Sequence, residues 1–249
     1  DKKVKFGEYS FKGNVKLIDI IETLINSDYY YRKIVIPECS TVEEVLDIIK
    51  SNAYLSGKIV ELPDEGSIFP DTYFFQRDDD KNEIILRMKK KMDQEVNAIW
   101  RNENSLLKSK LELIKLASII ESEALENNEK YIISSVFHNR IKKGMRLQSD
   151  PTILYSKNLK NKIKSRKIFK KDLLLDSPWN TYTRKGLPIT PICNPGKEAL
   201  YAAMNPTITS YLYFVANGMG GHRFSSNYKQ HLKNIELLKN KIRDINEIR

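Results

Sequence analysis

The residues whose chemistry stands out are two glutamates carried by one apolar helical segment. The segment LASIIESEA, residues 116–124, places Glu121 and Glu123 among leucine, isoleucine and alanine side chains. Burying a carboxyl group in apolar surroundings costs free energy and raises its pKa, so proteins keep such a residue mainly where a proton must be moved. The segment therefore predicts a general acid or base.

The helical period separates the two glutamates. At about 100° per residue, Glu121 falls inside the edge of an apolar stripe, whereas Glu123 lies on the other flank, toward solvent. The stripe consists of Leu106, Leu113, Leu116, Ala117, Ile120 and Ala124. We therefore predict that Glu121 transfers the proton. The alternative is that Glu121 is only a boundary residue of an amphipathic helix.

Length and composition place the chain among folded proteins. It has 249 residues, 41% of them hydrophobic, which is enough to bury a core and excludes the disordered class. The net charge of +10 suits nucleic acid, an anionic membrane surface or an acidic polymer such as a cell-wall glycan. Nucleic acid is disfavoured, because the basic residues are not interleaved with aromatic residues as in single-strand binders.

Neither the cysteines nor the histidines indicate a metal or cofactor. Cys39 and Cys193 are too few and too far apart for a zinc cluster, a CxxC redox motif or a disulfide framework. His138, His222 and His231 lack the local spacing of metal ligands. The sequence therefore suggests no metal and no cofactor.

Local patterns predict an α+β protein: a small α/β module at 1–78, a helical connector at 79–103 and a mixed, largely helical domain with a β-hairpin at 104–249. Predicted strands cover 7–11, 34–36, 72–75, 211–216 and 222–225. Predicted helices, besides that of Glu121, cover 16–25, 41–50, 79–100, 129–143, 197–204 and 228–248. Ser40 and Glu43 are the expected capping box of the second helix.

Two loops carry side chains suited to a sugar. In MRLQSDPTILY, Asp150 is the expected N-cap of a short helix, with Pro151 in its first turn and Gln148 in the loop before it. The long loop 177–196 carries Asn180 and Tyr182; aromatic rings stack on pyranose faces, and amides bind hydroxyl and acetamido groups. The alternative for these residues is ordinary cap and turn chemistry.

Taken in order, several motifs resemble one family. LASIIESEA, SVFHNRIKKGMRLQSDPTILY, SPWNTYTRKGLP, NPG, YLYFVANGMGGHRFSSN and QHLKN resemble the endolytic murein transglycosylase family, also called YceG-like. EGSIFPDTYFF and IVIPECSTVEEV resemble the LysM-like N-terminal portion of that family. The sequence departs from the pattern at Cys39, where the family usually has glycine, at Ile189 and Thr190, and at His138.

The resemblance implies cleavage of the β-1,4 bond between N-acetylmuramic acid and N-acetylglucosamine inside peptidoglycan strands, leaving 1,6-anhydro ends and ending nascent strands. It implies that Glu121 is both acid and base. It also implies a single-pass anchor in the bacterial inner membrane, a helix that these residues lack, with the catalytic domain on the outer side, and it leaves open whether a cell-wall synthase is a partner. The expected substrate groove contains Asn139, Gln148, Asp150, Tyr155, Asn180, Tyr182 and His222.

Two rival functions belong to other classes. A hydrolytic muramidase would use water and a second carboxylate, for which Glu123 and Asp150 are available. A non-enzymatic module would use the basic charge and the LysM-like portion to bind glycan or nucleic acid. Binding to nucleic acid would weaken steeply with salt, whereas a sugar groove built on stacking would not.

Overall fold

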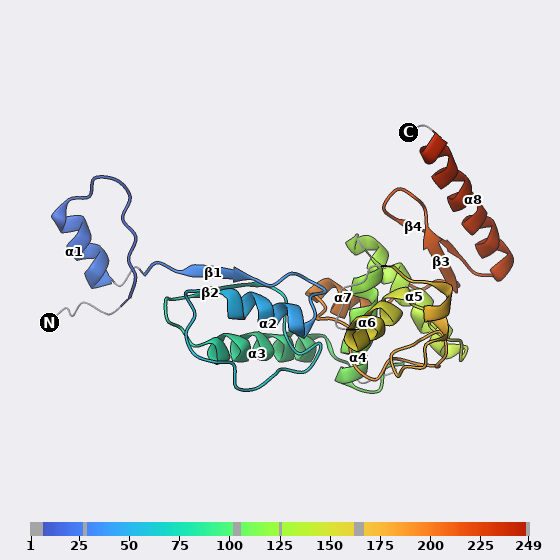
Figure 1. Ribbon diagram of the computed structural model, residues 1–249, viewed down its shortest axis with the longest axis horizontal. Helices are drawn as coiled ribbons and strands as arrows, with labels where there is room; N and C mark the ends of the chain where they lie inside the picture. The colour runs from blue at the N-terminus through green and yellow to red at the C-terminus, as the bar shows by residue number, and fades with distance from the viewer. Residues whose placement is uncertain (1–6, 27–28, 102–105, 125, 162–166, 248–249) are drawn as a thin grey trace.

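The computed structural model describes residues 7–26, 29–101, 106–124, 126–161 and 167–247. It confirms a mixed α+β protein that is mostly helical, with two small antiparallel strand pairs (Figure 1). Within these ranges, no helix combines the length and the hydropathy that crossing a bilayer requires. Helix α1 (Leu17–Asn26) buries no residue and lies apart from the rest of the fold.

The N-terminal core forms around one strand pair. Strand β1 (Arg32–Val35) pairs antiparallel with β2 (Thr72–Phe75), with Ile34 opposite Tyr73. Alternation sends Ile34, Tyr73 and Phe75 into the core, where they meet helix α2 (Val42–Ser51).

Helix α3 (Lys81–Ile99) belongs to two cores. Its first half gives Ile84, Ile85 and Met88 to the N-terminal core. Its second half gives Met92, Val96 and Ile99 to the core of the C-terminal part. Because a single helix contributes to both cores, it connects the N-terminal core to the C-terminal core (Figure 1).

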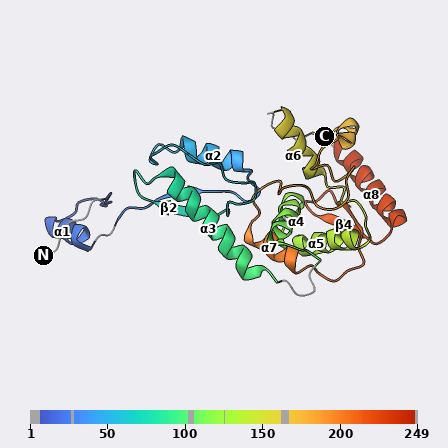
Figure 2. The same ribbon diagram turned by 90° about the horizontal axis from the view of Figure 1, so that it is seen from below.

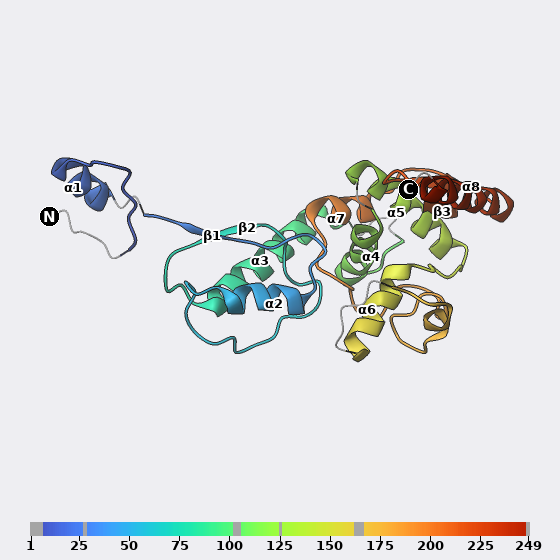
Figure 3. The same cartoon turned by 45° about the horizontal axis from the view of Figure 1, so that its top comes forward.

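Three helices form the centre of the second core. They are α4 (Lys110–Glu123), α5 (Asn127–Lys142) and α7 (Lys197–Met204), and α7 lies where α3, α4 and α5 meet (Figure 3). The small residues Ala199, Ala202 and Ala203 of α7 are fully buried, which lets its backbone approach its neighbours closely.

The remaining elements cover this core. Helix α6 (Asp150–Asn161) contacts α4 and the short 3-10 helix η1 (Lys170–Leu174). Strands β3 (Tyr213–Ala216) and β4 (His222–Ser225) form a hairpin, and helix α8 (Tyr228–Glu247) packs against both strands (Figure 2).

The structure corrects two local predictions. Residues 7–11 form no strand; Glu8 ties this segment to the chain before and in β1, because its carbonyl accepts from the Tyr30 amide (2.8 Å) and its carboxylate accepts two hydrogen bonds from Arg32 (2.9 Å each). The capping box of α2 lies one residue later than predicted, because Thr41 is the N-cap and Glu44 is its partner. The Ser40 hydroxyl instead donates to the Pro37 carbonyl (2.8 Å).

Gly66 packs tightly against the C-terminal part, and its replacement gives a prediction. It has φ +82°, and an added Cβ would lie 2.6 Å from Pro191 and 2.9 Å from Ile114. Gly144 also has positive φ, but nothing lies within 4 Å of its added Cβ. We expect Gly66→Ala to lower the free energy of unfolding by about 1–3 kcal/mol more than Gly144→Ala does, measured by urea denaturation. Equal losses of unfolding free energy in the two variants would show that the close packing of Gly66 against Pro191 and Ile114 does not contribute to stability.

Candidate functional site

Both glutamates lie in the last turn of α4, and that helix ends at Glu123. The side chains at these two positions point about 200° apart around the helix axis. The packing of α4 therefore gives Glu121 and Glu123 different surroundings.

Glu121 is held by two donors inside the protein. Lys130 Nζ on α5 donates to Oε1 (2.6 Å), and the Gly196 amide at the N-cap of α7 donates to Oε2 (3.0 Å). The side chains of Glu121 and Lys130 are only 5% and 2% exposed. Both carboxylate oxygens thus accept hydrogen bonds, one of them in an ion pair. These contacts give Glu121 a structural role, because they tie the end of α4 to α5 and to the start of α7.

Glu123 lies at a cleft instead. The cleft has a volume of about 510 Å³, and Glu123 lines it together with residues of α5, α6, the 177–196 loop, the hairpin and α8. Ser149 Oγ donates to Glu123 Oε1 (2.6 Å). Among the described residues, no hydrogen bond reaches Glu123 Oε2, so one carboxyl oxygen is left for a ligand.

The surroundings of Glu123 favour its protonated form. Burial raises the pKa of Glu123 to about 7; the hydrogen bond from Ser149 opposes the rise, the charge of Asp150 adds to it, and that of Arg140 opposes it. The carbonyl end of α4 also disfavours a negative charge at this position. A raised pKa near neutrality is the property that suits a carboxyl group to acid–base chemistry.

Four of the predicted groove residues line this cleft: Gln148, Asp150, Tyr182 and His222. The Tyr182 hydroxyl donates to the Asp150 carboxylate, which joins the 177–196 loop to the start of α6. The sequence predicted Asp150 as the N-cap, but helix α6 begins at Asp150 itself, and its carboxylate binds Tyr182 at the rim of the cleft.

His222 and Gln148 are held by neighbours outside the cleft. Glu129 accepts hydrogen bonds from the amide (2.8 Å) and Nδ1 (2.7 Å) of His222, so Nε2 is the ring nitrogen left for a ligand. Gln148 has φ +51°, and its amide donates to the Thr181 carbonyl (3.1 Å). The ring of His222 is therefore oriented by Glu129, whereas the bond to Thr181 fixes the backbone of Gln148, whose side-chain Oε1 accepts a long hydrogen bond from Arg140 (3.4 Å).

The structure places the other three predicted groove residues elsewhere. Asn139 Nδ2 donates to the carbonyls of Thr209 and Tyr211 (2.9 and 3.0 Å), which fixes the chain before the hairpin. Asn180 is fully buried, and its side chain bonds only backbone groups within its own loop and the segment 173–175. Both asparagine side chains form hydrogen bonds with the backbone of loops. An amide that binds backbone and an amide that binds a ligand cannot be told apart in the sequence.

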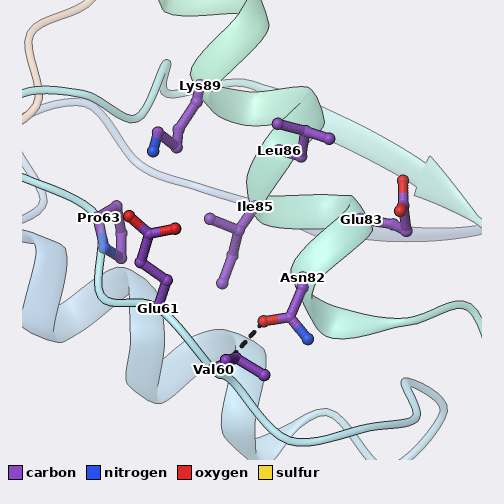
Figure 4. Close-up of a pocket in the computed structure, with 8 residues that line it drawn as sticks. All are labelled: Val60, Glu61, Pro63, Asn82, Glu83, Ile85, Leu86 and Lys89. Atoms are coloured by element: carbon purple, nitrogen blue, oxygen red, sulfur yellow. Dashed lines mark hydrogen bonds between the residues drawn. The ribbon is translucent and has the colours of Figure 1, made fainter.

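Tyr155 belongs to a second cavity. Its hydroxyl donates to Glu65 Oε2 (3.0 Å), and it lines a cavity of about 430 Å³ that also contains Cys39 and Cys193. A third hollow, of about 390 Å³, lies within the N-terminal part between α3 and residues 60–63 (Figure 4). There Asn82 Oδ1 accepts from the Val60 amide (3.0 Å), and none of the predicted site residues lines this hollow.

Sequence reasoning missed several residues of the cleft. Arg140 is buried and binds the carbonyls of Leu212 (2.6 Å) and Leu147 (2.7 Å), so it ties the hairpin to the loop before α6. Tyr213 stacks with His231 at a ring separation of 5.0 Å. Arg140 directly follows Asn139, so its place next to a predicted groove residue could have indicated it. Tyr213 and His231 lie on different elements, β3 and α8, so no local sequence pattern could have predicted that they pair.

The fold and the site define a class: a mostly helical α+β protein in which a carboxyl group of raised pKa, at the end of a core helix, lines a polar and aromatic cleft. Residues 1–237 match the YceG-like family, and the chain belongs to this family. The recognition made from the sequence motifs is thereby confirmed.

The relatives that the chain resembles share one name. It is 38% identical over 192 residues to the endolytic murein transglycosylase of Bacillus subtilis (strain 168), covering 77% of this chain and 52% of that protein. It is 31% identical over 173 residues to the endolytic murein transglycosylase of Streptococcus pneumoniae (strain D39), covering 69% of this chain and 31% of that protein. The chain thus spans about half of the first relative and about a third of the second.

A crystal structure shows a similar fold. A putative yceG-like protein from Listeria monocytogenes superposes with a TM-score of 0.67 and 32% identity, over 87% of this chain and 80% of that one.

Proposed function

We propose that this chain is the catalytic part of an endolytic murein transglycosylase, which cuts the glycan strands of peptidoglycan. The observation that carries the proposal is the carboxyl group of Glu123, whose pKa is raised to about 7 at a cleft of about 510 Å³. The shared name of the relatives supports the same activity.

In the proposed reaction Glu123 acts twice. Its protonated form gives a proton to the glycosidic oxygen, and the bond from that oxygen to the anomeric carbon of N-acetylmuramic acid breaks. The resulting carboxylate takes the proton of the C6 hydroxyl of the same sugar, whose oxygen closes a 1,6-anhydro ring. The chemistry needs one group that is acidic at the start and basic at the end, and a pKa near the working pH serves both steps.

The sequence prediction gave this role to Glu121, and the geometry favours Glu123. Glu121 has a donor on each carboxylate oxygen, whereas the contact from Ser149 leaves Oε2 of Glu123 available. The cleft also brings polar groups suited to a glycan: the amide of Gln148, the ring nitrogen of His222 and the aromatic faces of Tyr182 and Tyr213.

A hydrolytic muramidase is the second candidate, because Asp150 lines the same cleft as Glu123 and supplies a second carboxylate. Mass spectrometry of fragments released from purified peptidoglycan separates the two. We expect new ends lighter by one water than hydrolysis products. Reducing ends would establish the muramidase, and the absence of fragments from the full-length protein would support a glycan-binding module.

The pH dependence of cleavage follows from the same carboxyl group. The first step needs protonated Glu123, so kcat/KM is expected to fall as pH rises above about 7, approaching a tenfold loss per pH unit. Because the hydrogen bond from Ser149 lowers this pKa, Ser149→Ala should move the alkaline limb to higher pH. A profile that is flat from pH 6 to 9 would contradict the role of Glu123.

The N-terminal part and the location of the protein belong to the same proposal. We propose that residues 1–78 form a LysM-like module that presents glycan to the cleft, and that the protein acts outside the cytoplasm on a membrane anchor. Peptidoglycan strands are its proposed partner, and a cell-wall synthase that makes them is a further candidate. Termination of nascent strands would follow from cleavage next to such a synthase.

A further inference from the structure

The two cysteines of the chain meet where the N-terminal core touches the catalytic part. They are 154 residues apart in the sequence, yet Cys39 Sγ and Cys193 Sγ lie 2.6 Å from each other. Cys39 is in the turn between β1 and α2, and Cys193 is in the loop just before α7. These 249 residues contain only two cysteines, so within them each sulfur has the other as its only available partner.

Backbone contacts hold the two thiols together. The Cys39 amide donates to the Asn194 carbonyl (3.0 Å), and the Asn194 amide donates to the Ser40 carbonyl (2.9 Å). The Asn194 side chain adds a bond to the same Ser40 carbonyl (2.8 Å) and accepts one from the Ile68 amide (2.9 Å). The meeting of the sulfurs is thus set by the surrounding main chain, and little backbone movement is needed to bond them.

Cys39 has an unusual backbone conformation. It has φ +59°, in the left-handed region that only a few per cent of non-glycine residues occupy. A cysteine there carries a backbone cost that glycine would avoid. This conformation directs its sulfur to Cys193 and to Ser122 Oγ (3.0 Å), the residue between the two glutamates of α4.

We propose that Cys39 and Cys193 form a reversible disulfide that ties the N-terminal core to the loop leading into α7. The oxidant is an external disulfide, such as oxidised glutathione or an oxidoreductase. The Cys39 thiolate attacks it to give a mixed disulfide and a free thiol; Cys193 then attacks Cys39 Sγ, and the second thiol leaves. The external disulfide gains two electrons and two protons, and the protein loses the same number.

The environments of the two sulfurs suit this order. Both cysteines line the 430 Å³ cavity, but Cys39 is partly exposed whereas Cys193 is buried, so Cys39 is the thiol that an external disulfide meets first. The hydrogen bond from Cys193 lowers the pKa of Cys39, and burial raises the pKa of Cys193. Cys39 is thus the attacking thiolate and Cys193 the resolving thiol.

Alkylation and intact mass test the cross-link without any measurement of glycan cleavage. The full chain is incubated with oxidised glutathione or with dithiothreitol, denatured, and treated with iodoacetamide. We expect no alkyl groups and no glutathione on the oxidised monomer, two alkyl groups after reduction, and a non-reduced peptide pair containing Cys39 and Cys193. Two free thiols after oxidation, or a cross-link only between two chains, would overturn the proposal.

A glycine variant is the matched control. Cys39→Gly suits the φ of +59° and removes one sulfur, so it should fold and form no internal cross-link. Because the disulfide closes a long loop, the oxidised wild type should melt about 5–15 °C above the reduced form, and Cys39→Gly should show no such difference. Equal melting temperatures of the oxidised and the reduced wild type would contradict the proposal that the disulfide stabilises the contact between the N-terminal core and the loop before α7.

Discussion

Glu123→Gln is expected to lower the rate of glycan-strand cleavage by about 10²–10⁴-fold while leaving the fold intact. Glutamine has nearly the same shape and can still accept the hydrogen bond from Ser149 Oγ, but it cannot give a proton to the leaving oxygen. The measurement is the rate at which cleaved ends appear in mass spectra of digested peptidoglycan. Thermal melting of the variant shows whether the fold is retained.

Asp150→Asn is the matched control for this prediction, because it removes another carboxylate of the same cleft. A transglycosylase that uses Glu123 alone should keep most of its activity in Asp150→Asn, apart from what the contact with Tyr182 contributes to binding. If both variants are equally inactive and the wild type makes reducing ends, the two-carboxylate hydrolysis is correct. If Glu123→Gln cleaves at the wild-type rate, the proton is supplied from elsewhere, and Glu121 is the first residue to reconsider.

The second large effect is one of stability, at the ion pair between Glu121 and Lys130. Removing one partner of a buried pair leaves an unpaired charge, which typically costs about 3–5 kcal/mol. We therefore expect Glu121→Gln and Lys130→Met each to lower the free energy of unfolding by about that amount in urea denaturation. In Glu121→Gln the ammonium of Lys130 stays buried, and among the described residues Glu38 (3.7 Å) is the carboxylate that remains near it.

Two controls separate this effect from general damage. The double variant Glu121→Gln with Lys130→Met removes both charges and should recover part of the loss. The ion pair of Arg184 and Asp176 is exposed (55% and 89%), so Asp176→Asn should cost less than about 1 kcal/mol. If Glu121→Gln were as stable as the wild type yet inactive, the structural role of Glu121 would be wrong and the sequence-based assignment would be favoured.

Local patterns in the sequence were sufficient for most of the elements. Helix α7 begins and ends at the predicted residues 197 and 204, and strand β2 covers the predicted 72–75. The predicted 222–225 strand is also exact, because alternation and a glycine-rich turn are local signals. The strand predicted at residues 7–11 was wrong for the opposite reason: a strand needs a partner, and no strand among the described residues pairs with this segment.

The sequence by itself determined that two carboxyl groups lie near the end of one apolar helix, about 200° apart, and it predicted Gln148, Asp150, Tyr182 and His222, which line one cleft in the structure. Only the tertiary structure decided which carboxyl group is open to a ligand. The apolar flank of α4 faces α5 and α7, and there Lys130 and the Gly196 amide occupy Glu121. The polar flank faces a cleft that encloses Glu123. The helical period gives the angle between two side chains, but the direction in which a helix packs depends on residues far away in the sequence.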